Sequence, residues 1–184
     1  MPDASPCADN PSFGRKYIRD MVYAANDGIV TTFAVVAGVR GADLPAVIVL
    51  ALGFANLAAD GLSMGLGNYL GIKSERATEL GDRYDERRET ISAARHGAVT
   101  WLSFVLAGLV PLVPFFFGLS HARAFAISVA ATATTMFGVG AARTLVTRRS
   151  AWRGGLEMLF VGGLAGAAAF LAGWGVEAAT DGAS

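Results

Sequence analysis

The 184-residue sequence has little charge and almost no cysteine. Lys, Arg, Asp and Glu make up 16% of its residues, whereas in soluble domains they make up about a quarter. Cys7 is the only cysteine, which excludes an internal disulfide and a cysteine-based metal cluster. The formal net charge is zero, so no overall basic field favours nucleic acid as a partner. The H-E-x-x-H, P-loop and Cys-x-x-Cys motifs are also missing, and we expect no enzymatic activity.

Long apolar segments take the place of the missing charge. The chain is 53% hydrophobic, with a mean hydropathy of +0.46. A helix that crosses the bilayer core needs about 20 mostly apolar residues. Five segments reach this length, at 20–39, 45–72, 96–118, 122–146 and 154–176. We therefore predict an all-α integral membrane protein with five transmembrane helices, in which Pro111 and Pro114 kink the third span near its outer end.

The polar segments divide the chain further. The first fourteen residues contain three prolines and no apolar core, so they do not form a signal peptide. We expect a disordered cytosolic tail at 1–16, a transmembrane domain at 17–176 with a charged cytosolic segment at 73–95, and a C-terminal tail at 177–184.

Basic residues predict the orientation in the membrane. Thirteen of the fifteen Lys and Arg residues lie before the first span, in 73–95, or between the last two spans. Only Arg40 and Arg123 fall on the other side. Because cytoplasmic loops carry the excess of Lys and Arg, we expect the N-terminus inside the cell and the C-terminus outside.

Glycines recur four residues apart within the spans, as Gly61/Gly65, Gly67/Gly71 and Gly162/Gly166. Small residues at this spacing let helices approach closely in lipid. Each pair is explained either by packing within one protomer or by self-association.

Three carboxylates interrupt the apolar spans: Asp27 in the first, Asp60 in the second and Glu157 in the fifth. Ionisable residues at such positions usually face a protein interior or a water path. At 1.5 Å per residue, Asp27 lies about 10 Å and Met64 about 12 Å from the cytosolic face. Asp60 lies one turn deeper, and Glu157 lies about 5 Å in. The spacing predicts a ladder of polar groups in the inner half of the membrane.

Polar side chains also follow one face of the second span. Four of them are spaced by four residues and share a helical stripe: Asn56, Asp60, Met64 and Asn68. Neighbouring spans add Thr31, Thr132, Thr134, Thr135 and Met136. Carboxylate, amide, hydroxyl and thioether groups together suit a cation path, and the sulfur favours a late first-row metal such as Fe²⁺. A structural network of hydrogen bonds between helices is the alternative.

Two stretches, YAANDGIVTTFAVVAGV and NLAADGLSMGLGNYLGIKSE, resemble the vacuolar iron transporter family. RHGAVTWLSFVLAGLVPLVPF and LEMLFVGGLAG are similar to the third and fifth spans of that family, and the resemblance covers about 17–176. It implies a homodimer of five-helix protomers that moves Fe²⁺, and often Mn²⁺, out of the cytosol by proton-coupled antiport. It also implies a path along the dimer axis lined by Asp27 and Met64. The metal is the substrate, and no cofactor is expected.

The sequence departs from the family pattern in two places. Many eukaryotic members have a glutamate where this chain has Asn56. Plant and yeast-like members insert a glutamate-rich domain between the second and third spans, and the segment 73–95 is too short for it. We expect a short, bacterial-type member in a bacterial inner membrane, with Asp60 and Glu157 as further metal ligands and Asn56, Thr31 and Asn68 lining the pore.

The segment 73–95 still carries acidic residues in a 4-3-4-3 spacing: Glu75, Glu79, Asp82, Glu86 and Glu89. On a continuous helix they form one face that could capture metal. The alternative is a solvated helix with ion pairs such as Glu79–Arg83, and Gly81 weakens any helix at its middle. The histidines, His96 and His121, are expected at the membrane interfaces.

A metal-binding membrane sensor or scaffold without transport is the competing function. The sequence does not distinguish it from a transporter except through the family resemblance, and it does not rank Fe²⁺ against Mn²⁺, Co²⁺ or Zn²⁺.

Overall fold

The structure, a computed structural model, describes residues 13–147 and 150–181; for 13–16, 82, 144–147 and 181 it describes the backbone only. Most of the predicted N-terminal tail therefore lies outside the described residues. The elements are α1 (Phe13–Gly41), α2 (Ala46–Leu80), the short 3-10 helix η1 (Gly81–Arg83), α3 (Glu86–Gly108), the 3-10 helix η2 (Val110–Phe117), α4 (His121–Thr147) and α5 (Ala151–Asp181). Within the described ranges there is no strand, which confirms the all-α prediction.

Four of these helices, α1, α2, α4 and α5, are long and apolar enough to cross a membrane by themselves. The fifth candidate is the pair α3 and η2, which passes the same test when the two are joined and is bent by 43° at the break between them. Pro111 and Pro114 lie in η2, directly after the bend. The predicted kink is therefore confirmed, and its cause is the loss of backbone N–H donors and the steric demand of the two proline rings.

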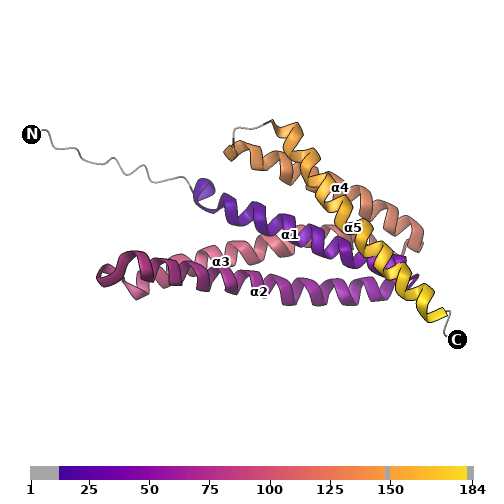
Figure 1. The fold of residues 1–184 in the computed structure, drawn as a ribbon, viewed down its shortest axis with the longest axis horizontal. Helices are drawn as coiled ribbons and strands as arrows, with labels where there is room; N and C mark the ends of the chain where they lie inside the picture. The colour runs from indigo at the N-terminus through magenta and orange to yellow at the C-terminus, as the bar shows by residue number, and fades with distance from the viewer. Residues whose placement is uncertain (1–12, 148–149, 182–184) are drawn as a thin grey trace, which may run out of the picture.

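Helix α1 lies at the centre of the bundle, where it packs mainly against α3 and α5 (Figure 1). The neighbouring pairs are α2 with α3 and α4 with α5. The central position explains why α1 contributes many of the fully buried side chains, among them Ile29, Thr32 and Val36. Phe104 of α3 and Leu112 of η2 complete the buried centre.

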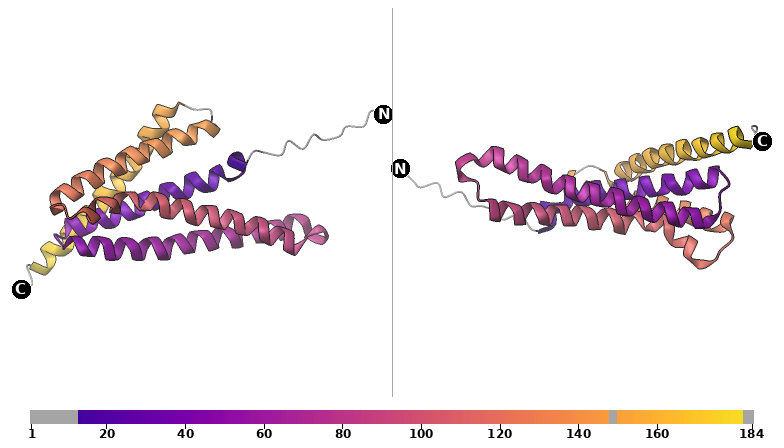
Figure 2. Two further views of the ribbon diagram at one scale, coloured as in Figure 1. Left: turned by 180° about the vertical axis from the view of Figure 1, so that it is seen from behind. Right: turned by 90° about the horizontal axis from the view of Figure 1, so that it is seen from below.

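All three basic regions lie at one end of the bundle. This end holds the start of α1, the turn between α2 and α3, the last turn of α4 and the first turn of α5 (Figures 1 and 2). The connections from α1 to α2 and from η2 to α4 lie at the opposite end, together with the C-terminal end of α5. The topology thus brings together the segments that the charge distribution assigns to one side of the membrane.

Two of the three glycine pairs are used for packing within the chain. A Cβ atom at Gly65 would lie 2.9 Å from the Trp101 Cβ atom, and one at Gly97 would lie 2.6 Å from the Gly65 carbonyl oxygen. Glycine is required here because the backbones of α2 and α3 approach too closely for any side chain. A Cβ atom at Gly162 would clash with the Met136 side chain, and one at Gly166 with the Phe33 ring.

The pair Gly67/Gly71 differs. A Cβ atom at either residue would meet no atom within 4 Å. Packing within the protomer therefore does not explain these two glycines.

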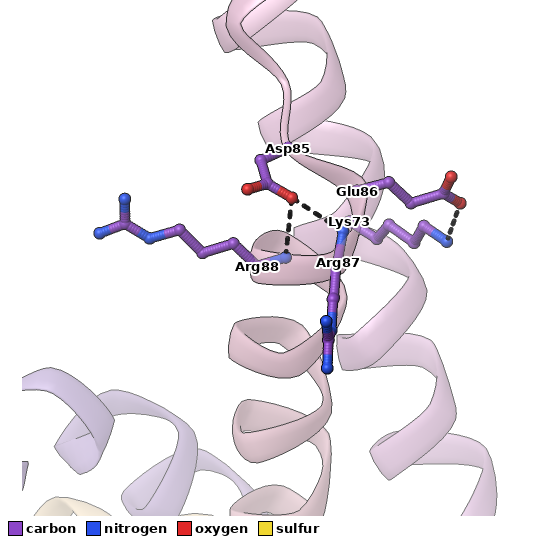
Figure 3. Close-up of polar contacts among 5 residues, drawn as sticks. All are labelled: Lys73, Asp85, Glu86, Arg87 and Arg88. Atoms are coloured by element: carbon purple, nitrogen blue, oxygen red, sulfur yellow. Dashed lines mark hydrogen bonds and ion pairs between the residues drawn. The ribbon is translucent and has the colours of Figure 1, made fainter.

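The charged segment 73–95 is not one continuous helix. Helix α2 ends at Leu80, and Gly81 takes a left-handed backbone conformation with φ of 49° as its C-cap. Asp85 then caps α3, because its carboxylate accepts hydrogen bonds from the backbone N–H groups of Arg87 (3.1 Å) and Arg88 (3.2 Å) (Figure 3). The single acidic face that a continuous helix would give is therefore not formed.

Candidate functional site

A cavity of about 810 Å³ opens between α1, α2 and α3. Its lining runs from the polar stripe of α2 to the charged end of the bundle. The residues that line it are Arg19, Asp20, Tyr23, Asp27, Met64, Gly67, Asn68, Gly71, Ile72, Glu75, Arg76, Glu79, His96 and Thr100. It is the place where carboxylate, thioether, amide and imidazole groups from three helices meet.

Asp27 and Met64 line this cavity from α1 and α2. Both side chains are half-buried. The two residues that the helix rise places at one level thus line one cavity, to which Asp27 brings an oxygen donor and Met64 a sulfur donor. Their role as metal ligands stays a prediction.

Hydrogen bonds fix the backbone around Asp27. The Thr31 hydroxyl donates to the Asp27 carbonyl oxygen (2.8 Å), and the Asn56 amide donates to the Thr31 hydroxyl (3.4 Å). These two hydrogen bonds join α1 to α2 through Thr31 and Asn56, which do not line the cavity. Asn56 is therefore a helix-linking residue in this structure and does not border the cavity.

Asp60 lies close enough to Asp27 for their charges to interact. It is half-buried but does not belong to the cavity lining. The negative charges of neighbouring carboxylates repel each other, and a bound cation or proton relieves that repulsion.

Asn68 and Thr100 join α2 to α3 across the cavity wall. The Asn68 amide donates to the Thr100 hydroxyl (2.7 Å), and the Thr100 hydroxyl donates to the His96 carbonyl oxygen (2.9 Å). The amide that the sequence predicts to line the pore therefore borders the cavity and is also tied to the third span.

His96 and Asp20 form a contact that the sequence analysis did not foresee. The His96 Nδ1 atom and the Asp20 Oδ2 atom are 2.5 Å apart, and the two side chains are only 13% and 16% exposed. The Tyr17 ring packs on the imidazole with ring centroids 4.4 Å apart. One sequence signal was present: each residue stands at the end of its span that the Lys and Arg distribution predicts to be cytosolic, so the helix-rise argument used for Asp27 and Met64 also places them at one level.

Charged groups surround the open end of the cavity. Lys73 and Glu86 form an ion pair (3.3 Å; Figure 3). Arg76 pairs with Glu79 (3.4 Å) and with Glu89 (3.9 Å). The acidic residues proposed for metal capture are thus divided: Glu75 and Glu79 line the cavity, whereas Glu86 and Glu89 on α3 face basic residues of α2. The Asp82 side chain lies outside the described part of the structure.

Glu157 does not join this group. Its side chain on α5 is 65% exposed and lies 3.9 Å from Arg143 of α4. Of the four residues in the predicted ladder, Asp27 and Met64 line the cavity, whereas Asp60 and Glu157 do not. Glu157 is carried by α5, which packs mainly on α1 and α4.

The residues of α4 that were expected beside the path also lie elsewhere. Met136 is buried against Ile29 and Met158 in the apolar core. Thr134 and Thr135 donate hydrogen bonds to carbonyl oxygens of their own helix, and Thr132 is buried. None of the four lines the cavity.

No resident metal centre is evident in the described ranges 13–147 and 150–181, where no three His, Cys, Asp or Glu side chains are arranged to hold a metal ion. The letters GLSMG at 61–65 match the G-x-S-x-G pattern of hydrolases. They lie in the middle of α2, however, and not on the strand-to-helix turn that a nucleophilic serine needs.

Comparison with known proteins gives a consistent match over nearly the whole membrane domain. The sequence model of the VIT family matches residues 18–92 and 78–174. The chain is 28% identical to vacuolar iron transporter 2 of Oryza sativa over 208 residues, covering 83% of this chain and 85% of that protein. It is 28% identical to vacuolar iron transporter 1 of Arabidopsis thaliana over 83% of each chain, and 33% identical to vacuolar iron transporter homolog 5 of Oryza sativa over 73% of this chain and 71% of that one.

These relatives are named as transporters, in agreement with the expectation that the chain is not an enzyme. Its several apolar helices make it a multi-pass membrane protein. On the family match and on the fold that carries it, the chain belongs to the VIT family.

Proposed function

We propose that the protein transports Fe²⁺, and also Mn²⁺, out of the cytosol by proton-coupled antiport along a path lined by Asp27 and Met64. The observation that carries the proposal is the cavity between α1, α2 and α3, whose lining includes both residues. The names of the related vacuolar iron transporters support iron as the substrate.

The donor chemistry suits a metal that must be bound and then released. A carboxylate oxygen and a thioether sulfur form a mixed set, which leans toward Fe²⁺ more than toward Mg²⁺ or Ca²⁺. Two donors are too few to hold the ion permanently. Asp60 next to Asp27 adds negative charge, so that an entering cation relieves a repulsion as well as gaining ligands.

A second protomer would complete the donor set, and we propose a homodimer. Beside the polar stripe, α2 presents a row of small exposed residues spaced by four: Ala51, Ala55, Ala59, Ser63, Gly67 and Gly71. A row of small residues lets two helices approach closely in lipid. Two copies of α2 joined on this row would bring two copies of the neighbouring polar stripe to one axis.

We propose that the charged end of the bundle faces the cytosol, because the three basic regions meet there. Glu75 and Glu79, near this end of α2, belong to the lining of the cavity, and we propose that metal enters from the cytosol past these two carboxylates. The host membrane is proposed to be a bacterial inner membrane, on the ground that the turn between α2 and α3 carries no large inserted domain; the related plant proteins are named as vacuolar.

The test is metal uptake by liposomes that contain the purified protein and have an acidic interior. Fe²⁺ kept reduced, Mn²⁺, Co²⁺ and Zn²⁺ are compared at several pH values. We expect Asp27→Asn and Met64→Ala each to lower Fe²⁺ uptake about tenfold or more, since each removes a direct donor. Matched controls are Asp43→Asn, in the loop at the opposite end, and Met21→Ala, on the exposed side of α1.

Wild-type uptake by both Asp27→Asn and Met64→Ala would exclude this path. Metal binding by the wild-type protein without any flux would instead support the competing function, a membrane sensor or scaffold.

A further inference from the structure

We infer that His96, held in place by Asp20, is the group that exchanges a proton for the transported cation at the cytosolic mouth of the cavity. This inference rests on the proposed function and assigns its proton coupling to a residue.

The geometry gives His96 both a fixed orientation and access to the cation. The Asp20 Oδ2 atom lies 2.5 Å from the His96 Nδ1 atom, although the two residues are 76 positions apart in the sequence. The Tyr17 ring packs on the imidazole. The imidazole is nonetheless part of the lining of the cavity that Asp27 and Met64 share. Its backbone carbonyl is tied to Asn68 through Thr100, so His96 is held on the wall of the path.

The charges around His96 favour positive charge in the cavity. From α1, it contacts Asp20 and Tyr17, and it shares the cavity lining with Arg19, Tyr23 and Asp27. From α2, the same lining holds Glu75, Glu79 and Arg76. Carboxylates outnumber guanidinium groups, so the space attracts either a proton on His96 or a divalent cation.

The exchange follows from the Asp20 contact. When Nδ1–H donates to the Asp20 carboxylate, Nε2 is left as the atom that gains or releases a proton. Histidine is the side chain whose charge ordinarily changes between about pH 5 and 8. A divalent cation that enters the cavity raises the local potential, the Nε2–H bond breaks, the electron pair stays on nitrogen, and the proton leaves to water.

The coupling has the direction that antiport requires. The proton is released at the cytosolic mouth as the metal enters from the cytosol, and linkage requires that a protonated His96 weaken metal binding by the same factor. Asp20 acts as a positioning residue, because its carboxylate holds the imidazole at Nδ1.

The first experiment measures proton flux and Mn²⁺ flux together in liposomes that contain a pH-sensitive dye. The variant is His96→Gln, whose amide can still donate to Asp20 but does not titrate. The matched control is His121→Gln at the opposite end of the bundle, where the ring packs on Phe115. We expect His96→Gln to lower the protons moved per Mn²⁺ about fivefold or more, and to flatten the pH dependence of uptake, while His121→Gln leaves both unchanged.

Asp20→Asn adds a readout that a merely structural role would not move. The loss of the carboxylate should shift the pH dependence of Mn²⁺ uptake toward acid by about one pH unit, because the charged imidazole loses its partner. Unchanged proton flux per Mn²⁺ in His96→Gln, or an unchanged pH profile in Asp20→Asn, would overturn the inference.

A second measurement needs no change at His96 and covers the case in which the variants do not fold. The chain has two histidines, so ring carbon signals in nuclear magnetic resonance give two titration curves, and His121→Gln assigns them. Zn²⁺, a diamagnetic probe, should lower the titration midpoint of His96 by about one pH unit; an unchanged midpoint in a sample that binds Zn²⁺ would contradict the inference.

The outcomes separate the two proposals. No metal uptake by the wild-type protein would reject the proposed function itself. Wild-type antiport that persists unchanged in His96→Gln would reject only the assignment of the proton to His96.

Discussion

Asn68 on α2 donates a 2.7 Å hydrogen bond to Thr100 on α3, across the wall of the cavity. The bond joins the two spans at the depth where the polar stripe of α2 meets the charged mouth. A second bond, from Thr100 to the His96 carbonyl oxygen, extends the connection along α3. The polar residues of the cavity therefore also determine how α2 and α3 are positioned relative to each other.

Replacement of Asn68 by alanine should weaken this connection. Hydrogen bonds between spans contribute about 0.6 kcal/mol on average, so we expect a small fall in thermal unfolding temperature in detergent and a clear fall in Fe²⁺ uptake. Ser74→Ala, at an exposed position of the same helix outside the proposed dimer row, is the control and should retain both. An Asn68→Ala protein with full uptake would show that the bond does not matter for the path.

The close contact between α2 and α3 predicts a larger effect at Gly97. A methyl group there would lie 2.6 Å from the Gly65 carbonyl oxygen, so Gly97→Ala should force the helices apart and destabilise the fold by about 1–3 kcal/mol. Gly138→Ala on α4, where a Cβ atom meets nothing within 4 Å, is the matched control. Thermal unfolding of both variants, measured in one detergent, checks the difference; equal unfolding temperatures would refute it.

Gly67 offers a test of the proposed dimer. A leucine side chain at this position meets no atom of its own protomer within 4 Å of its Cβ, so Gly67→Leu should fold but lose dimerisation. Gly163→Leu on α5 is equally free of contacts at Cβ and should stay dimeric. Light scattering on the detergent-solubilised proteins gives the masses. A dimeric Gly67→Leu protein would argue against an interface on this face of α2.

Ser128 of α4 forms a hydrogen bond to the third span at its bend. Its buried hydroxyl donates to the Pro111 carbonyl oxygen (2.7 Å), which supplies a hydrogen bond at the point where the regular helix is interrupted. Ser128→Ala leaves that carbonyl buried without this donor and should cost about 1–3 kcal/mol. Thr134→Val, which loses only a bond to its own helix, should cost less. Thermal unfolding again measures both, and a reversed order would contradict the role given to Ser128.

The sequence predicted where the helices lie along the chain better than which of their side chains line the cavity. Span positions and the kink at Pro111 and Pro114 follow from local rules, since apolar length and proline geometry act within one segment. The common level of Asp27 and Met64 could also be predicted, because depth follows from helix rise alone.

The rotation of each helix about its own axis could not be predicted in this way. Glu157 has the predicted depth of a cavity residue, but its side chain on α5 lies beside Arg143 of α4. Met136 is buried in the apolar core. The contact between Asp20 and His96 depends on how α1 packs against α3, and close-packed glycines such as Gly28 and Gly108 allow that approach. Such packing is set by the whole bundle, so no single stretch of sequence reveals it.

The turn between α2 and α3 has a practical consequence. Helix α2 has 35 residues and is therefore about 52 Å long, whereas the bilayer core is about 30 Å thick. Its last turns and the first turns of α3 extend past the ends of the other helices as a two-helix stem (Figures 1 and 2). At 19.0 kDa the protein is small for single-particle imaging. A folded soluble domain spliced into Gly81–Arg83, with both of its ends continued as helix, would be rigidly attached to two membrane spans and would serve as an alignment marker.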